Sequence, residues 1–202
     1  MSSPVSVLSP SDTVEQAVRV MLQGRFGAVP LEREGKIVSI VTETDILQCY
    51  LDDSKINATR SWRDLKVVDH MSDAVITAKP TDHVMPTFRV MQENKIRHLP
   101  IVDGDGLVGL ISDRDLRRSY GREIAVNLAK DDLEPEALYQ FTLEDVMSRR
   151  VETMDRFATL AQSARRMVDC KIGALPVTAQ EKLLGIIAET DLLELLVSNC
   201  ER

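Results

Sequence analysis

The residues of this chain best suited to bind a ligand lie between Lys95 and Leu116. Ser112 is followed three residues later by Asp115, at a point where the pattern predicts that a helix begins. A helix N-terminus offers free N–H groups and a partial positive charge to an anion. A carboxylate one turn into the helix can accept hydrogen bonds from two ribose hydroxyls. The same pair can also simply cap the helix, and the local sequence alone favours capping.

Two other stretches of the chain carry the same pattern. Thr42 and Asp45 repeat the hydroxyl and the carboxylate, whereas Ala188 takes the place of the hydroxyl before Asp191. The copies are spaced by 70 and then 76 residues, as the residues that mark the register show: Met21, Met91 and Met167; Pro30, Pro100 and Pro176; Asp45, Asp115 and Asp191. Such constant offsets indicate three copies of one unit.

Each copy is predicted to fold as strand, helix, strand, strand, helix, which is a mixed α/β (α+β) unit. In the first copy, Asp12 with Glu15 suggests a capping box before a helix that ends near Gly24, and Thr42 caps a second helix. In the second, we expect a strand over 74–78 and a helix from about residue 82. In the third, we expect a strand over 151–154 and helices over 160–168 and 189–197.

The repeats are expected at residues 1–51, 67–120 and 141–199, with polar spacers at 52–66 and 121–140. A short segment ending at Met71 or Met147 precedes the second and third repeats. It has no counterpart before the first repeat, so the sequence leaves open how the edge of that repeat is packed.

A single repeat is too small to cover the apolar face of its own sheet. Repeats of this kind bury that face by stacking on a neighbour. Three repeats leave one without a partner in the same chain. We therefore expect the spare repeat to pair with its counterpart in a second molecule, as an isologous homodimer.

The order of these motifs resembles the cystathionine-β-synthase (CBS) domain. The shared features are a strand, a D-x-x-V helix, a strand with a central proline, a turn, a G-h-h-S/T-x-x-D segment (h is hydrophobic) and a final helix. They cover nearly the whole chain outside the spacers, and repeat three departs from them at Ala188. The resemblance implies tandem repeats packed in pairs through their sheets, which commonly bind adenosine-containing ligands in the clefts between paired repeats.

The resemblance also implies roles for individual residues. Arg97 and His98 occupy positions that CBS domains direct at ligand phosphates, and Arg114 could add a third contact. Thr77 and Thr153 lie where the family holds the base or the sugar, although an exposed strand threonine needs no such role. The expected ligand-binding residues are Thr77, Arg97, His98, Ser112, Arg114 and Asp115, with Thr42 and Asp45 in repeat one and Asp191 in repeat three.

The other repeats lack the basic pair, having Gly27-Ala28 and Gly173-Ala174 at these positions. For His98 considered alone, a half-buried, hydrogen-bonded histidine is the better interpretation. The cluster of Arg97, His98, Ser112, Arg114 and Asp115 instead favours a site for an anion and a ribose.

Two motifs that suggest other chemistry are set aside. Gly104 to Gly109 spells G-x-G-x-x-G, but a dinucleotide site needs a helix to open directly from it, and here it links two predicted strands of a hairpin. The glycines therefore serve a turn. The three cysteines form no C-x-x-C pair, and no histidine has metal-ligand or catalytic spacing. We expect neither a metal site nor an enzyme.

Composition sets broader limits. The chain has 202 residues and a net charge of −7, which opposes nonspecific binding to nucleic acid or an anionic membrane. It has no apolar run long enough to span a membrane and no signal-peptide pattern at its start. We therefore expect a cytoplasmic protein with reduced cysteines.

Two hypotheses follow. The first is a regulatory sensor that binds AMP, ADP, ATP, S-adenosylmethionine or a related adenosyl ligand, which would be a ligand and not a required cofactor, and signals to an unidentified effector protein. The second is a ligand-free scaffold for oligomerisation or protein interaction, which is favoured by the missing hydroxyl in repeat three and the missing basic pairs.

Overall fold

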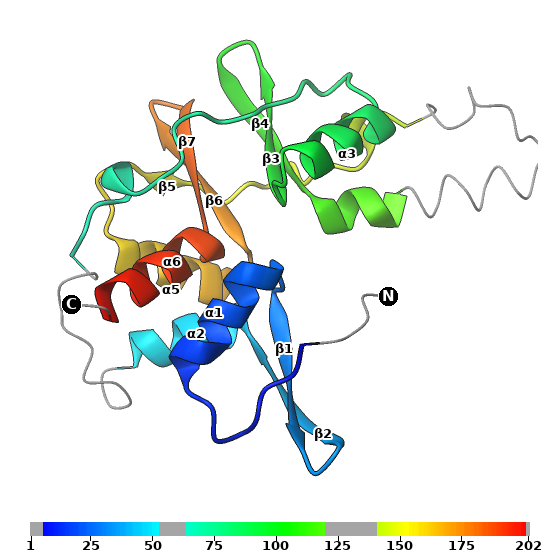
Figure 1. Cartoon of the computed structure of the whole chain (residues 1–202). Coiled ribbons are helices and arrows are strands. Elements are labelled where there is room, and N and C mark those ends of the chain that lie inside the picture. Colours follow the sequence, from blue (N-terminus) through cyan, green and yellow to red (C-terminus); the bar gives the residue numbers. More distant parts are fainter. Residues whose placement is uncertain (1–5, 53–63, 120–140, 201–202) are drawn as a thin grey trace, which may run out of the picture. The chain divides into compact units, whose positions relative to one another are not determined.

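Each repeat forms a helix, a β-hairpin and a second helix, as Figure 1 shows. The computed structural model describes residues 6–52, 64–119 and 141–200. Repeat one contains α1 (Val14–Gly24), β1 (Ala28–Arg33), β2 (Lys36–Thr42) and α2 (Glu43–Leu51). Repeat two contains α3 (Val84–Glu93), β3 (His98–Asp103), β4 (Gly106–Ser112) and a helix through residues 113–119. Repeat three contains β5 (Met154–Asp155), α5 (Leu160–Cys170), β6 (Ala174–Ala179), β7 (Lys182–Ala188) and α6 (Glu189–Cys200).

The predicted mixed α/β fold is confirmed, and several local predictions need correction. The capping box of α1 is formed by Thr13 and Gln16 and not by Asp12 and Glu15. The Asp12 carboxylate instead accepts a hydrogen bond from the N–H of Ser9 at 2.8 Å, which stabilises the preceding turn. The predicted capping of α2 by Thr42 is correct.

The strand expected over 74–78 does not form. Only Ala78 makes a bridge, to Ile101, with one hydrogen bond to Pro100 and one from Val102. The segment therefore attaches to the hairpin at a single point. In repeat three, β5 is short and starts at Met154, and the helices run further than predicted, to residues 170 and 200. The spacer at 121–140 and most of the one at 52–66 lie outside the described residues.

All three predicted hairpins are present, each with a two-residue turn. In repeat two the turn is Gly104-Asp105, and Gly104 has a φ of 57°. The G-x-G-x-x-G segment thus belongs to a hairpin, as predicted from the sequence. Repeat three makes its turn with Gln180 and Glu181, both in the left-handed region, so the turn does not depend on glycine.

The structure contains two compact units, and repeat three contributes to both. Unit 1 consists of Met1–Met71, Met154–Leu175 and Ile186–Arg202. Unit 2 consists of Ser72–Thr153 and Pro176–Gly185. None of the helices in the described ranges is long and apolar enough to cross a membrane.

In unit 1, helices of repeat one pack against helices of repeat three. Helix α2 contacts α5 and α6, and α1 contacts α6. The buried apolar residues include Met21, Ile46, Leu47, Leu160, Met167 and Leu193. The Thr44 hydroxyl donates a 2.7 Å hydrogen bond to the Glu189 carboxylate within this helical layer. The sequence did not reveal this pairing of repeats one and three.

In unit 2, the core lies between α3 and the β3–β4 hairpin. Its buried members are Val84, Met91, Leu99, Ile101, Ile111, Leu116, Leu143 and Met147. Strand β7 follows β4 in the sheet and β6 follows β7; Gly106 of β4 is paired antiparallel with Lys182 of β7. Repeats two and three therefore meet through their sheets. Pairing of this kind was expected from the sequence, which did not indicate which repeats pair.

The segments that precede repeats two and three are exchanged between these repeats. We call residues 65–71 lead-in 2 and residues 141–147 lead-in 3. Lead-in 2 binds repeat three: the Val67 N–H donates to the Ala158 carbonyl, and the Leu160 N–H donates to the Leu65 carbonyl, both at 2.9 Å.

Lead-in 3 binds repeat two at the equivalent positions. The Leu143 N–H donates to the Asp82 carbonyl at 2.8 Å, and the Val84 N–H donates to the Phe141 carbonyl at 3.1 Å. Each lead-in thus completes the start of a helix that belongs to another repeat.

Repeat one has no such cover at the start of α1 within the described residues. Val14 is 39% exposed, whereas the equivalent residues Val84 and Leu160 are fully buried beneath the exchanged lead-ins. Repeat one is therefore the incompletely packed repeat.

The lead-in exchange predicts unequal effects of changing two adjacent valines. Val67 is fully buried against repeat three, whereas Val68 is 37% exposed. Val67→Ala should lower the free energy of unfolding by about 1–3 kcal/mol, because it removes buried methyl groups and leaves a cavity. Val68→Ala should cost less than about 0.5 kcal/mol. Urea unfolding followed by circular dichroism measures both, and equal effects would contradict the observed packing.

Candidate ligand-binding site

The β3–β4 hairpin brings most of the predicted site residues of repeat two together. The antiparallel register places His98 directly opposite Ser112. The Asp113 N–H donates a 2.9 Å hydrogen bond to the Arg97 carbonyl, which joins the start of β3 to the start of the following helix. Arg97, His98, Ser112, Arg114 and Asp115 are thus gathered at one end of the hairpin. We call these five residues the repeat-two cluster.

Ser112 and Asp115 cap the helix reciprocally. The Ser112 N–H and hydroxyl donate to Asp115 Oδ2 at 3.1 and 2.5 Å, and the Asp115 N–H donates to Ser112 Oγ at 3.3 Å. The capping interpretation is therefore correct for the structure as it stands. All of these bonds to the carboxylate end on Oδ2. Within the described part of the chain, Oδ1 accepts no hydrogen bond, so it can accept one from a ligand.

His98 is partly buried between the charged members of the cluster. Burial lowers its pKa to about 4, and Arg97 adds to that effect. Asp113 and Asp115 act in the opposite direction, and Arg114 lowers the pKa further. The imidazole is therefore neutral near pH 7. The cluster offers guanidinium groups and a neutral imidazole donor, and not the additional cation that the sequence suggested.

Repeat one has the same cap without the cations. The Thr42 N–H and hydroxyl donate to Asp45 Oδ2 at 2.9 and 2.6 Å. Gly27 and Ala28 stand where repeat two has its basic pair. In repeat three, the Ala188 N–H donates to the Asp191 carboxylate at 2.8 Å, and alanine has no hydroxyl to add a second bond. Repeat two therefore has both the side-chain cap and the basic pair, repeat one has the cap without the basic pair, and repeat three has neither the capping hydroxyl nor the basic pair.

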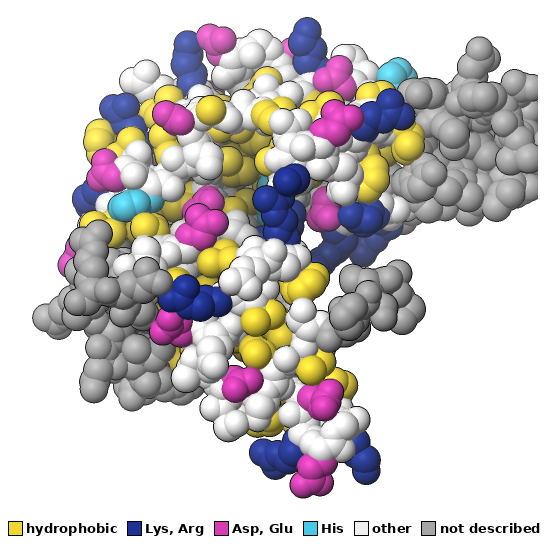
Figure 2. All heavy atoms as spheres, in the orientation of Figure 1, with side chains coloured by type: hydrophobic (Ala, Val, Ile, Leu, Met, Phe, Trp, Pro, Cys, Tyr) yellow, Lys and Arg dark blue, Asp and Glu magenta, His cyan; other side chains and the backbone are white. Residues whose placement is uncertain are grey.

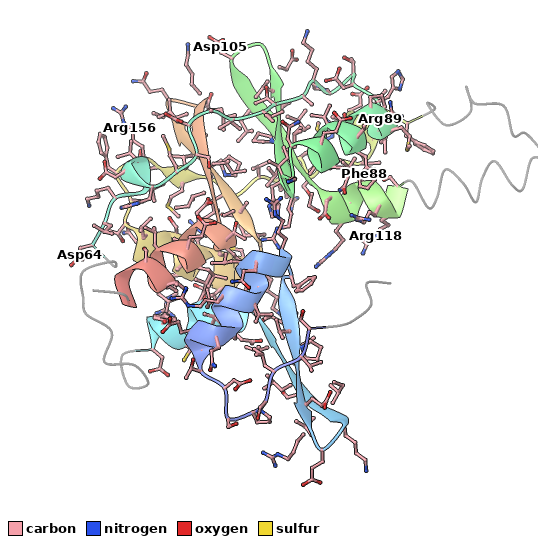
Figure 3. All side chains as sticks on the ribbon, viewed as in Figure 1. Asp64, Phe88, Arg89, Asp105, Arg118 and Arg156 are labelled. Carbon is pink, nitrogen blue, oxygen red and sulfur yellow. The ribbon has the colours of Figure 1, made fainter. Side chains whose placement is uncertain are left out.

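Thr77 lies apart from the cluster. It lines a cavity of about 320 Å³ at the opposite end of the hairpin, together with Val102, Gly104, Asp105 and Lys182. His98 precedes Val102 by four residues on β3, which corresponds to roughly 13 Å along a strand. Figure 3 shows Asp105 at the hairpin tip and Arg118 on the helix at the other end. Thr153, the equivalent residue of repeat three, is exposed.

Lys182 is a cavity residue that the sequence did not identify. Its ammonium group forms a 2.8 Å ion pair with Asp105, which lies 77 residues earlier in the chain. No local motif marks such a pair. The only signal in the sequence was that Asp105 and Lys182 lie at the tips of equivalent hairpins, in repeats two and three.

No metal site is visible in the parts of the chain that the structure describes. They contain no group of three histidine, cysteine, aspartate or glutamate residues that could hold an ion. Cys49 is half-buried and Cys170 is exposed, and both are free thiols.

Comparisons with known proteins identify the family. The sequence pattern of the CBS domain matches residues 1–52, 63–122 and 143–198. The chain belongs to the CBS domain family. The uncharacterized protein MJ1225 of Methanocaldococcus jannaschii is 29% identical over 196 residues, which make up 96% of this chain and 67% of that protein. Its crystal structure, described as that of a proposed archaeal homologue of γ-AMPK, superimposes with a TM-score of 0.79 over the same shares of the two chains.

Two similar structures contain adenosine-based ligands. The CBS domain pair of MJ0100, in complex with 5′-methylthioadenosine and S-adenosyl-L-methionine, has 27% identity and a TM-score of 0.54, covering 67% of this chain and 98% of its own. CBSX2 in complex with AMP has 26% identity and a TM-score of 0.55, covering 68% of this chain and 98% of its own.

The environment of His98 predicts a pH-dependent stability. Its pKa is about 4 in the folded chain against an ordinary value of 6.5. Between these values the unfolded state binds more protons, so the free energy of unfolding should fall as the pH falls, by roughly 2–3 kcal/mol across the window. His98→Gln should remove this part of the loss, whereas His70→Gln, which changes a histidine outside the cluster, should keep it. Urea unfolding between about pH 7 and pH 4.5 tests this, and an unchanged slope in His98→Gln would contradict the assignment.

Proposed function

We propose that this protein is a regulatory module that binds an adenosine-containing ligand at the repeat-two cluster. The observation that carries the proposal is the pairing of His98 with Ser112. This register joins a cationic strand start to a carboxylate at a helix start, and only repeat two has both. The ligands present in the MJ0100 and CBSX2 structures support an adenosyl compound as the ligand class.

The chemistry of each group suggests its role. The free Oδ1 of Asp115 accepts a hydrogen bond from a ribose hydroxyl without breaking the helix cap on Oδ2. The helix N-terminus and the Arg97 and Arg114 guanidinium groups attract a phosphate or another anionic group. The neutral imidazole of His98 donates or accepts one further hydrogen bond. Binding needs no proton transfer, and no catalytic step is part of the proposal.

Regulation requires the ligand to favour one arrangement of the protein over another. A ligand shifts such an equilibrium only by its differential affinity for the two states. Repeats two and three meet at Gly106 of β4 and Lys182 of β7, near the tip of the β3–β4 hairpin. A ligand bound at the other end of this hairpin can bias that pairing through the two strands that join the cluster to the tip. An effector protein then recognises the favoured state.

The ligand class is tested first by thermal shift with AMP, ADP, ATP, S-adenosylmethionine and cyclic di-AMP. A ligand present at 100 times its Kd should add about 2.7 kcal/mol to the free energy of unfolding. If none of these ligands raises the melting temperature at about millimolar concentration, the adenosyl proposal is wrong. The reciprocal Ser112–Asp115 cap, which is complete without a ligand, then favours the scaffold function.

The site is tested by titration calorimetry on single variants. Asp115→Ala should weaken binding of the identified ligand by roughly 10- to 100-fold, because a buried hydrogen bond to a charged group is worth about 1.5–3 kcal/mol. Asp45→Ala is the matched control, since it removes the same cap from repeat one. Asp45→Ala and Asp191→Ala should each weaken binding less than Asp115→Ala does. Equal losses in the three variants would contradict the ranking of the sites.

A further inference from the structure

The helical face of repeat two carries an arginine where the other repeats carry a buried leucine. The constant spacing of the repeats makes Arg117 the equivalent of Leu47 in α2 and of Leu193 in α6. Both leucines are fully buried in the helical layer that repeats one and three share in unit 1. The side chain of Arg117 is instead 58% exposed. Repeat two therefore has a charge at a position that the other two repeats bury between their helices.

An aromatic side chain on α3 supports this arginine. Phe88 is equivalent to Val18 of α1 and to Ala164 of α5, which are both fully buried. Phe88 itself is half-buried against the core of unit 2. The guanidinium carbon of Arg117 lies 5.1 Å from the centre of its ring, and Arg117 also makes a 3.4 Å ion pair with Asp113. Stacking on a ring holds a guanidinium at the surface with its edge free to bind an anion.

Two further arginines flank the stack of Arg117 on Phe88. Arg89 follows Phe88 on α3, Arg118 follows Arg117 on the next helix, and both are exposed. Figure 3 shows Phe88 where the two helices meet, with Arg89 and Arg118 to either side, and Figure 2 shows basic side chains above and below hydrophobic ones in this region. Within the described part of the chain, neither Arg89 nor Arg118 forms an ion pair. We call Phe88, Arg89, Arg117 and Arg118 the basic face.

The charges of the basic face restrict what can cover it. Burying an arginine against apolar helices, as Leu47 and Leu193 are buried, removes its hydration without supplying an anion and is unfavourable. A second copy of the same face would bring arginines against arginines, and like charges repel. The net charge of −7 opposes binding to nucleic acid. Arginine and aromatic residues are common at the centres of protein interfaces, and guanidinium groups bind carboxylates through two parallel hydrogen bonds.

We propose that the basic face binds an acidic segment of a partner protein. Carboxylates of that segment pair with Arg89, Arg117 and Arg118, and an apolar side chain packs on the exposed part of Phe88. The proposal goes beyond ligand binding, because the basic face contains no residue assigned to the ligand of the repeat-two cluster. Binding of the partner and binding of the ligand are therefore tested separately and can fail separately. Under the proposed function, this surface is where the effector protein binds.

The interaction is tested on the full chain with a fluorescein-labelled acidic peptide. The peptide has about 12 residues, which as a helix match the length of α3; it is rich in glutamate and carries leucines on one face. A neutral peptide has glutamine in place of every glutamate. The acidic peptide should bind in a fluorescence anisotropy titration, and its Kd should rise as salt is added. No binding of the acidic peptide, or equal binding of the two peptides, would overturn the proposal.

Single variants locate the binding surface. Arg117→Gln and Arg89→Gln should each weaken binding of the acidic peptide about fivefold or more, as expected for arginines at the centre of an interface. Arg165→Gln is the matched control: Arg165 is the equivalent of Arg89 in repeat three and is also exposed, so its loss should leave the Kd unchanged. Equal losses in all three variants would show general charge attraction and would contradict binding at the basic face. Circular dichroism confirms that each variant is folded.

Other occupants of the basic face would give different results. A single-stranded oligonucleotide of about 12 nucleotides that displaces the peptide would indicate a nucleic-acid site. A dimer in light scattering that Arg117→Gln dissociates would place this face between two copies of the chain. The acidic run from Asp131 to Glu136 lies outside the described residues; it is the occupant if amides in place of its carboxylates strengthen peptide binding more than equally many amides on repeat one do. Each of these results would overturn a partner protein as the occupant.

Discussion

Two short segments, lead-in 2 and lead-in 3, close the cores of repeats to which they do not belong in sequence. Val67 and Leu143 are fully buried at equivalent positions, each at the start of a helix from the other repeat. The exchange supplies hydrogen bonds to backbone groups that a helix start would otherwise leave unpaired. It also couples the stability of repeats two and three, because neither core is complete without a segment of the other.

Among the described residues, no such segment covers the first helix of repeat one. Val14 at the start of α1 is exposed, and no described strand other than β1 pairs with β2. The helices of repeat one are nonetheless buried, because α1 and α2 pack against α5 and α6 of repeat three in unit 1. Repeat one thus packs through its helices, whereas within the described ranges its strand β2 pairs only with β1.

The proposed ligand site shows how the same residues can serve stability and binding. The Ser112–Asp115 cap uses one carboxylate oxygen and leaves the other available. Repeats one and three retain parts of this cap but lack the basic pair. Burial of His98 between two arginines keeps its imidazole neutral, so the electrostatic attraction for an anion comes from the guanidinium groups and the helix terminus.

The sequence by itself determined the repeat, the order of its elements, the hairpins and the cap at Thr42, because these depend on local periodicity, turn chemistry and short-range hydrogen bonds. It also grouped Arg97 and His98 with Ser112 and Asp115, since one hairpin register joins them. It misplaced the cap of α1 by one residue and predicted a strand over 74–78 that forms only one bridge. Only the tertiary structure decided the exchange of lead-ins, the packing of repeat one on repeat three, the separation of Thr77 from the cluster and the neutrality of His98. These depend on contacts between residues far apart in the chain and on burial, and neither leaves a local trace in the sequence.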